Sequence, residues 1–110
     1  METRVIQYGL GPIGSAVARH VVERSGLTLV GGVDIDPSKV GRDIGEVIGL
    51  DRPLGVVVSE KLGQVLARTE GDQGPLCVIH TTSSYFDLFK DQILEILEAG
   101  LDVVSTAEEL

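Results

Sequence analysis

Short apolar runs alternate along the chain with segments in which apolar residues recur every three or four positions. Nearly continuous apolar runs are typical of strands that are buried on both faces of a sheet, whereas the wider spacing is typical of one face of a helix. The predicted strands are 4–8, 27–34, 56–58, 76–80 and 101–105. Strands and helices therefore alternate from one end of the chain to the other.

The first predicted helix begins at Pro12, because proline suits the first helical position, where its missing N–H is not needed. Its expected inner face comprises Ile13, Ala16, Val17 and Val21. The second helix is expected to begin at Asp36 and Pro37, as an N-cap followed by a first-turn proline. The apolar stripe behind it comprises Val40, Ile44, Val47 and Ile48.

The third predicted helix has Ser59 as its N-cap and Leu62, Val65 and Leu66 on its inner face. The fourth, at 85–99, is the longest and has an aromatic and aliphatic inner face. Crossovers between parallel strands are right-handed, which restricts the topologies that this order of elements allows. The sequence thus predicts one α/β domain, residues 1–110, with a Rossmann-like, doubly wound parallel sheet of about five strands in the order 3-2-1-4-5.

The turn between the first strand and the first helix, residues 9–14, carries Gly9, Gly11 and Gly14 in the spacing G-x-G-x-x-G, and we name it the glycine turn. The first glycine allows a tight turn, the second leaves room for a pyrophosphate, and the third allows close packing of helix on sheet. Amides at a helix N-terminus also favour phosphate. In this strand–turn–helix setting the motif predicts a dinucleotide site, with Pro12 and Ile13 among its cofactor-binding residues.

Asp34 ends the second predicted strand, about 20 positions after Gly14. A carboxylate at this place accepts hydrogen bonds from the adenosine ribose and repels a 2′-phosphate, so NAD is the expected cofactor. Lys39 and Arg42 lie near enough in sequence to weaken that repulsion, which leaves NADP as the alternative. Asp36 fits a helix cap better than a ribose ligand.

The fourth predicted strand ends beside the point where the strand order reverses, which is where such sheets bind ligands. Thr81, Thr82 and Ser83 follow this strand, and their hydroxyl groups are predicted to contact the cofactor. The alternative for Ser83 is to cap the next helix. His80 and His20 lack the partners of a catalytic triad or a metal site, so no catalytic residue is assigned.

Gly31 and Gly32 interrupt the second predicted strand. Glycine inside a strand often marks the close approach of another backbone or of a ligand. The glycine turn, the adenosine and the first helix are the candidates for this close neighbour.

The chain has 110 residues and a net charge of −8, with nine Lys and Arg scattered among 17 acidic residues. This balance disfavours binding to nucleic acid or to an anionic membrane surface. No apolar run reaches the roughly 18 residues of a transmembrane helix, and no signal peptide is visible, so a soluble cytoplasmic protein is expected. Cys77 is the only cysteine, which excludes an intrachain disulfide and a thiolate cluster, and no metal site is predicted.

The chain resembles the N-terminal domain of 2,4-diaminopentanoate dehydrogenase, a family related to dihydrodipicolinate reductase. The resemblance is carried by QYGLGPIG at 7–14, VDIDP at 33–37, IHTTSS at 79–84 and STAEEL at 105–110. It implies the NAD(P)-binding domain of an oxidoreductase, which in that family deaminates a diamino acid and passes hydride to the nicotinamide. It also implies a C-terminal substrate domain that this sequence lacks, so this chain alone is expected to bind cofactor without catalysis.

A non-catalytic regulatory domain that senses NAD(H) is the alternative function, since such domains share the glycine turn and the acidic residue after the second strand. The two classes differ in the domain that the parent gene would encode after Leu110: a substrate domain for the enzyme, or a membrane or regulatory domain for the sensor. The last strand is expected to lie at an exposed edge of the sheet. Such an edge can pair with the same strand of a second chain, so a homo-oligomer is a further possibility.

Overall fold

The computed structural model describes residues 3–69, 71, 74–81 and 102–105. The strands are β1 (Thr3–Tyr8), β2 (Leu27–Val33), β3 (Val58–Ser59), β4 (Leu76–His80) and β5 (Asp102–Ser105). The helices are α1 (Pro12–Glu23), α2 (Ile44–Val47) and α3 (Leu62–Thr69). The helix predicted at 85–99 lies outside the described residues.

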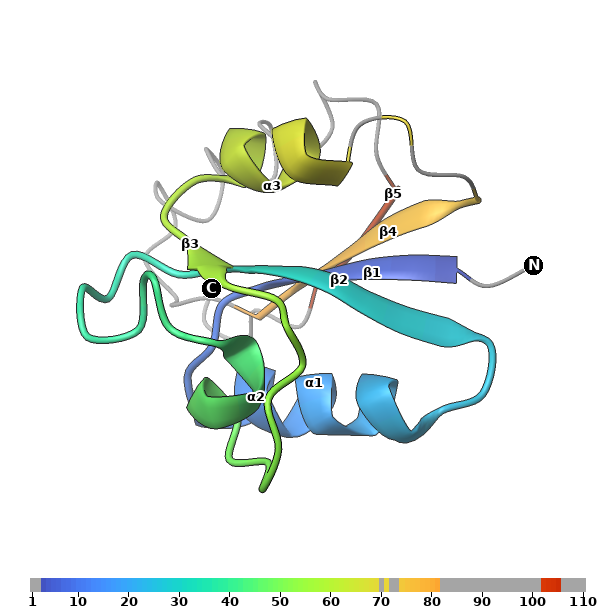
Figure 1. The fold of residues 1–110 in the computed structure, drawn as a ribbon. Coiled ribbons are helices and arrows are strands. Elements are labelled where there is room, and N and C mark those ends of the chain that lie inside the picture. The colour runs from blue at the N-terminus through green and yellow to red at the C-terminus, as the bar shows by residue number, and fades with distance from the viewer. Residues whose placement is uncertain (1–2, 70, 72–73, 82–101, 106–110) are drawn as a thin grey trace.

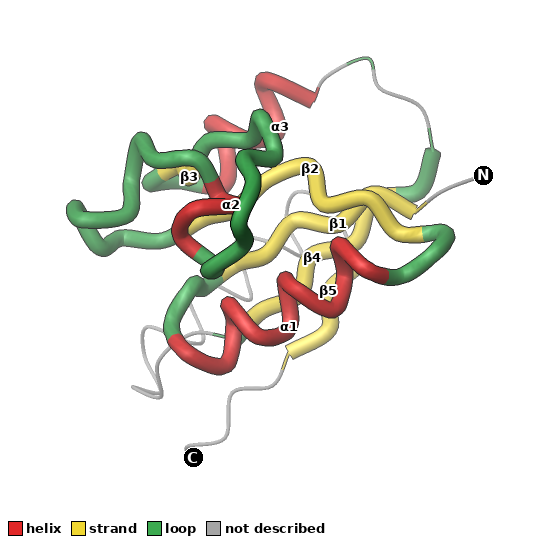
Figure 2. The backbone as a smooth tube through the Cα atoms, turned by 60° about the horizontal axis from the view of Figure 1, so that its bottom comes forward, coloured by secondary structure: helices red, strands yellow, loops and turns green. Residues whose placement is uncertain are grey.

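The strands form one parallel sheet in the order β3-β2-β1-β4-β5, as predicted (Figure 2). The central strand, β1, pairs with β2 on one side and with β4 on the other. The strand order therefore reverses between β1 and β4. The carboxyl ends of these two strands are level with each other, because Tyr8 pairs with His80.

Helices cover both faces of the sheet, with α1 and α2 on one face and α3 on the other (Figure 1). The core accordingly divides into two clusters. The cluster on the face of α1 and α2 includes Val5, Leu10, Ala18, Val21, Leu29 and Ile44. The cluster on the face of α3 includes Ile6, Tyr8, Val33, Leu62, Val65 and Val78. Successive side chains of β1 enter opposite clusters, because neighbouring residues of a strand point to opposite faces.

The prediction of a helix beginning at Asp36 is wrong. Residues 37–41 form turns, Asp43 makes an antiparallel bridge with Val57, and α2 begins only at Ile44. The carboxylate of Asp36 accepts hydrogen bonds from the backbone N–H (2.9 Å) and the hydroxyl (2.8 Å) of Ser38, and it closes a turn instead of capping a helix. Short polar side chains compete with helices through such local bonds. Gly41 has φ of 88°, a conformation that no helix passes through.

The third strand is displaced by up to two residues, since β3 comprises Val58 and Ser59 and not 56–58. Ser59 therefore lies in the strand and is not the N-cap of α3, which corrects the prediction. Its hydroxyl accepts a hydrogen bond from the guanidinium of Arg68. The start of α3 is satisfied by the side chain of Gln64, whose oxygen accepts hydrogen bonds from the N–H groups of the two residues before the helix.

Gly31 and Gly32 are both buried in β2, and at each position a close neighbour leaves no room for a side chain. A side-chain carbon at Gly31 would collide with Val65 of α3. A side-chain carbon at Gly32 would lie 2.5 Å from Ile44 of α2 and 3.2 Å from Leu10 of the glycine turn. The predicted approach of the glycine turn to β2 is therefore confirmed. The helices that pack closely on these two glycines are α3 and α2, and not α1 as predicted.

Asp43 is the N-cap of α2 and also holds the following loop. Its carboxylate accepts hydrogen bonds from the backbone N–H groups of Gly45 (2.8 Å), Leu54 (2.9 Å) and Gly55 (2.8 Å). Burial raises the pKa of this carboxyl, but the hydrogen bonds from Leu54, Gly55 and Gly45 outweigh burial and hold the pKa below its usual 3.8. The ionised form of Asp43 is therefore the one that the fold stabilises.

Asp43→Ala is expected to lower the free energy of unfolding by about 1–3 kcal/mol at pH 7, because three backbone N–H groups lose their acceptor. The pKa of Asp43 is lower in the folded chain than in the unfolded one, so its stabilisation is present above the unfolded value and is lost as pH falls through the folded value. Urea unfolding at pH 7 and at pH 3 should show the difference between the two proteins shrinking. A difference that stays constant over this range would contradict the assignment.

Candidate functional site

The glycine turn leaves β1 at the carboxyl edge of the sheet, beside the point where the strand order reverses. Gly9 has φ of 106°, a conformation that side chains disfavour. Its N–H donates a hydrogen bond to the carbonyl oxygen of Val33 at 2.8 Å. The tight turn expected at Gly9 is therefore present, and it is attached to the end of β2.

Gly14 and Gly11 differ in the space around them. A Cβ at Gly14 would collide with the carbonyl oxygen of Gly9 and would lie 2.5 Å from Thr81 Oγ1, so α1 packs directly on the turn. A Cβ at Gly11 would meet no atom within 4 Å. Packing thus requires glycine at position 14, whereas no neighbour in the described residues requires it at position 11. Free space beside the backbone is what a closely approaching ligand needs.

The N-terminus of α1 adjoins this space, with Gly11 as N-cap and no side-chain capping bond. First-turn amides lack partners within a helix and carry the positive end of its dipole, which suits an anion. Since Pro12 has no N–H, these amides belong to Ile13 and Gly14. The sequence places Ile13 on the inner face of α1, but its side chain is 54% exposed. The buried residues of α1 are Gly14, Ser15, Ala18 and Val21.

Asp34 directly follows β2, and its carboxylate lies beside the glycine turn. One oxygen accepts a hydrogen bond from the N–H of Leu10 at 2.8 Å, and the other accepts one from the N–H of Asp36 at 2.9 Å. Asp34 therefore fixes the glycine turn to the loop after β2. Each carboxylate oxygen can accept more than one hydrogen bond, so Asp34 retains capacity for a ligand.

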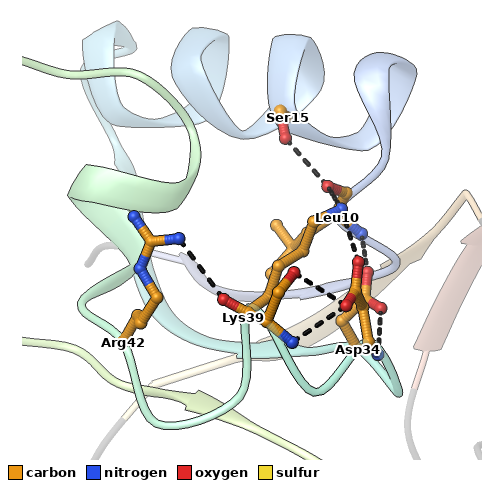
Figure 3. A network of polar contacts seen from close by, with 7 residues as sticks. Leu10, Ser15, Asp34, Lys39 and Arg42 are labelled. Atoms are coloured by element: carbon orange, nitrogen blue, oxygen red, sulfur yellow. Dashed lines mark hydrogen bonds and ion pairs between the residues drawn. The ribbon is translucent and has the colours of Figure 1, made fainter.

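Polar contacts converge on the backbone of Leu10, as Figure 3 shows. Its carbonyl oxygen accepts hydrogen bonds from Lys39 Nζ at 2.8 Å and from Ser15 Oγ at 3.1 Å. Its N–H donates to Asp34. The glycine turn is thus held from α1, from the end of β2 and from the loop that precedes α2.

The loop after β2 carries both signs of charge. Lys39 Nζ lies 3.9 Å from a carboxylate oxygen of Asp36, and Arg42 forms an ion pair with Glu46. Arg42 also donates to the carbonyl oxygen of Ser38 at 3.3 Å. Hydrogen bonds from Ser38 hold the pKa of Asp36 below its usual value, and the charge of Lys39 acts in the same direction. The two cations of this loop, Lys39 and Arg42, are therefore both already paired.

Thr81 follows β4 and contacts the glycine turn. Its hydroxyl accepts a hydrogen bond from Gln7 Nε2 at 2.8 Å and donates one to the carbonyl oxygen of Gly9 at 3.2 Å. The structure therefore brings Thr81 and the glycine turn together, as the sequence predicts for segments on either side of the reversal point. Thr82 and Ser83 lie outside the described residues.

Neither histidine suggests a catalytic group. His80 is fully buried at the end of β4, with its ring centroid 5.5 Å from that of Tyr8, and His20 is exposed on α1. The part of the chain that the structure describes gathers no three His, Cys, Asp or Glu side chains in an arrangement suited to a metal ion. None of its helices has the length and hydrophobicity that crossing a bilayer requires.

Sequence reasoning missed the parts played by Gln7 and Leu10. A polar residue in the central strand was the available signal for Gln7, because strands that are buried on both faces are otherwise apolar. Leu10 offered no signal, since the groups that Lys39 and Asp34 contact belong to its backbone.

A doubly wound parallel sheet with a glycine turn at the reversal point defines the class of Rossmann-like domains. Residues 3–106 match the family described as dihydrodipicolinate reductase, N-terminus. The chain belongs to this family, which confirms the relationship that its sequence suggests.

The chain is similar to reductases and to amine dehydrogenases. A 4-hydroxy-tetrahydrodipicolinate reductase from Synechocystis is 37% identical over 91 residues, which cover 81% of this chain and 33% of that protein. An amine dehydrogenase from Streptomyces virginiae is 33% identical over 106 residues, which cover 93% of this chain and 28% of that protein. The solved structure of an amine dehydrogenase from Mycobacterium smegmatis matches with a TM-score of 0.80 and 32% identity, over 96% of this chain and 30% of that one. The chain thus spans about a third or less of each relative.

Proposed function

We propose that this chain is the NAD(P)-binding domain of an oxidoreductase. The observation that carries the proposal is the space at Gly11, where a Cβ would meet no atom within 4 Å although the neighbouring Gly14 is tightly packed. Space that packing does not require, next to the amides of a helix N-terminus, suits a pyrophosphate. The names of the relatives, reductase and dehydrogenase, support redox chemistry.

The described members of the proposed cofactor-binding set lie at the carboxyl edge of the sheet, and Thr82 and Ser83 are outside the described residues. In this proposal the glycine turn holds the pyrophosphate, Asp34 holds the adenosine ribose, and the loop after β4 contacts the nicotinamide half. The proposed set is Gly9, Gly11, Pro12, Ile13, Gly14, Asp34, Thr81, Thr82 and Ser83. The nicotinamide would supply hydride transfer, and the residues of this chain would bind and orient it.

We propose NAD as the preferred cofactor over NADP. The carboxylates of Asp34 and Asp36 place negative charge at the ribose end of the proposed site, which repels a 2′-phosphate. The cations that could offset this repulsion are engaged, Lys39 with Leu10 and Asp36, and Arg42 with Glu46. The preference therefore rests on how these charges are paired as well as on Asp34 itself.

For the whole enzyme we propose the oxidation of an amine or a diamino acid, as in 2,4-diaminopentanoate dehydrogenase, or a reduction of the dihydrodipicolinate reductase type. The amine dehydrogenases among the relatives support the first, and the reductases support the second. Because this chain spans about a third or less of each, we propose that it binds the cofactor and that catalysis needs a separate substrate domain.

Gly11→Val is expected to weaken NADH binding by about a hundredfold or more, because the new side chain occupies the space proposed for the pyrophosphate. The unfolding temperature should stay close to that of the original chain, since nothing packs against this position and Gly11 has φ of −73°. Calorimetric titration with NADH and thermal melts measure the two effects. Equal affinity in both proteins, or no binding by the original chain, would contradict the proposed function.

A further inference from the structure

Gln7 is a polar residue in the central strand of the sheet, and its side chain has no exposed surface. Its neighbours along β1, Ile6 and Tyr8, belong to the cluster on the face of α3, so the side chain of Gln7 points to the opposite face. Its amide nitrogen donates to the carbonyl oxygen of Gly9 at 3.1 Å and to Thr81 Oγ1 at 2.8 Å. Gln7 therefore joins the glycine turn to the end of β4.

The other atom of the Gln7 amide group is unsatisfied. Its oxygen, Oε1, is buried and has no hydrogen-bond partner within the described residues. A buried acceptor without a partner destabilises a folded protein. The groups that Gln7 contacts do not depend on it, because Thr81 Oγ1 itself donates to the carbonyl oxygen of Gly9. The needs of the fold therefore do not explain a polar side chain at this position.

We propose that Gln7 is a positioning residue for the dinucleotide site, present although its unsatisfied oxygen makes the folded chain less stable. This inference rests on the proposed function. Gly9 and Thr81 lie on either side of the strand-order reversal, where one bound dinucleotide contacts both segments. The Gln7 amide bonds to both, and together with the direct bond from Thr81 to Gly9 it restricts their separation. Binding then requires less ordering of the two segments, which increases affinity.

Gln7→Met distinguishes positioning from a role in the fold. Methionine has a similar length, lacks the amide and adapts readily to buried sites. The variant is expected to unfold at the same temperature as the original chain or higher, because it lacks the unsatisfied oxygen. Its Kd for NADH is expected to rise about tenfold, because the glycine turn and Thr81 lose their common partner. A role in the fold alone predicts the reverse: a lower unfolding temperature and an unchanged Kd.

Val5→Ala is the matched control, because Val5 is buried on the same face of β1, two residues before Gln7. It should lower the unfolding temperature and leave the Kd for NADH unchanged. Thr81→Val provides a second test, at a strand end where the change is not expected to prevent folding. If Gln7 acts through Thr81, the losses of affinity should not add. The double variant with Gln7→Met and Thr81→Val should then have the same Kd for NADH as the single variant that binds less tightly.

Titration with NADH and thermal melts of these variants decide the matter. Absence of NADH binding by the original chain contradicts the proposed function, and this inference with it. Binding by the original chain together with equal binding by Gln7→Met overturns this inference alone. A lower unfolding temperature for Gln7→Met, or additive losses of affinity in the double variant, also overturns it.

Discussion

Gly14→Ala is expected to lower the unfolding temperature by about 5–15 °C and to weaken NADH binding. Inside an ordinary helix the same change stabilises by roughly 1 kcal/mol, because alanine loses less conformational entropy on folding. Here the added Cβ collides with the carbonyl oxygen of Gly9, a backbone atom that cannot rotate away, and it presses on Thr81. Overpacking against a backbone atom is expected near the upper end of the usual range of about 1–3 kcal/mol, so it outweighs the helical gain by about 1–2 kcal/mol, and α1 must move away from the glycine turn.

Gly63→Ala is the control for this prediction, since Gly63 lies in α3 and a Cβ there meets no atom within 4 Å. It should leave stability unchanged or raise it by up to about 1 kcal/mol. Thermal melts of the two variants followed by circular dichroism measure the contrast. A Gly14→Ala variant as stable as Gly63→Ala would contradict the close contact between α1 and the glycine turn.

Asp34→Asn is expected to weaken NADH binding by about tenfold to a hundredfold and to reduce the discrimination against NADPH. The variant removes the negative charge that repels a 2′-phosphate and replaces one acceptor oxygen by a donor. One of the two N–H groups that Asp34 now satisfies, those of Leu10 and Asp36, then loses its partner. Part of the lost affinity therefore comes from a less ordered glycine turn, and that part should affect both cofactors alike.

Asp36→Asn separates these contributions, because the Asp36 carboxylate bonds to Ser38 and has no direct bond to the glycine turn, which it reaches only through its ion pair with Lys39. Its effect on NADH affinity should be small, with at most a modest gain for NADPH. Titrations of both variants with NADH and NADPH provide the ratio of the two affinities. If this ratio were the same in Asp34→Asn as in the original chain, Asp34 would not determine cofactor choice.

Local patterns predicted most of the fold, and the errors have a common origin. The order β3-β2-β1-β4-β5 followed from alternating periodicities and from the handedness of crossovers. The helix expected at Asp36 failed because its carboxylate and the conformation of Gly41 favour turns, although the apolar stripe continues to Ile48. Ile13 fitted the expected inner face of α1 by its spacing, but Gly14 and Ser15 pack against the turn instead. In each case a contact or backbone angle overrode the periodicity.

The candidate site was less predictable than the fold. Spacing alone located the glycine turn, the acidic residue after β2 and the hydroxyl residues after β4. Gln7 and Leu10 were missed because their parts depend on partners that are distant in sequence, 74 positions for the bond from Gln7 to Thr81 and 24 for the bond from Leu10 to Asp34. No local pattern identifies such pairs.

The sequence by itself determined that this is an α/β domain with a glycine turn at the point where the strand order reverses, because strand, turn and helix signals all act over a few neighbouring residues. Only the tertiary structure decided that Gly14 is required by packing while Gly11 borders free space, and that Asp34 holds the turn through Leu10. It also decided that the Gln7 amide lies between the turn and Thr81. The physical reason is that these features depend on the distances between separate elements, which are set when the helices pack against the sheet.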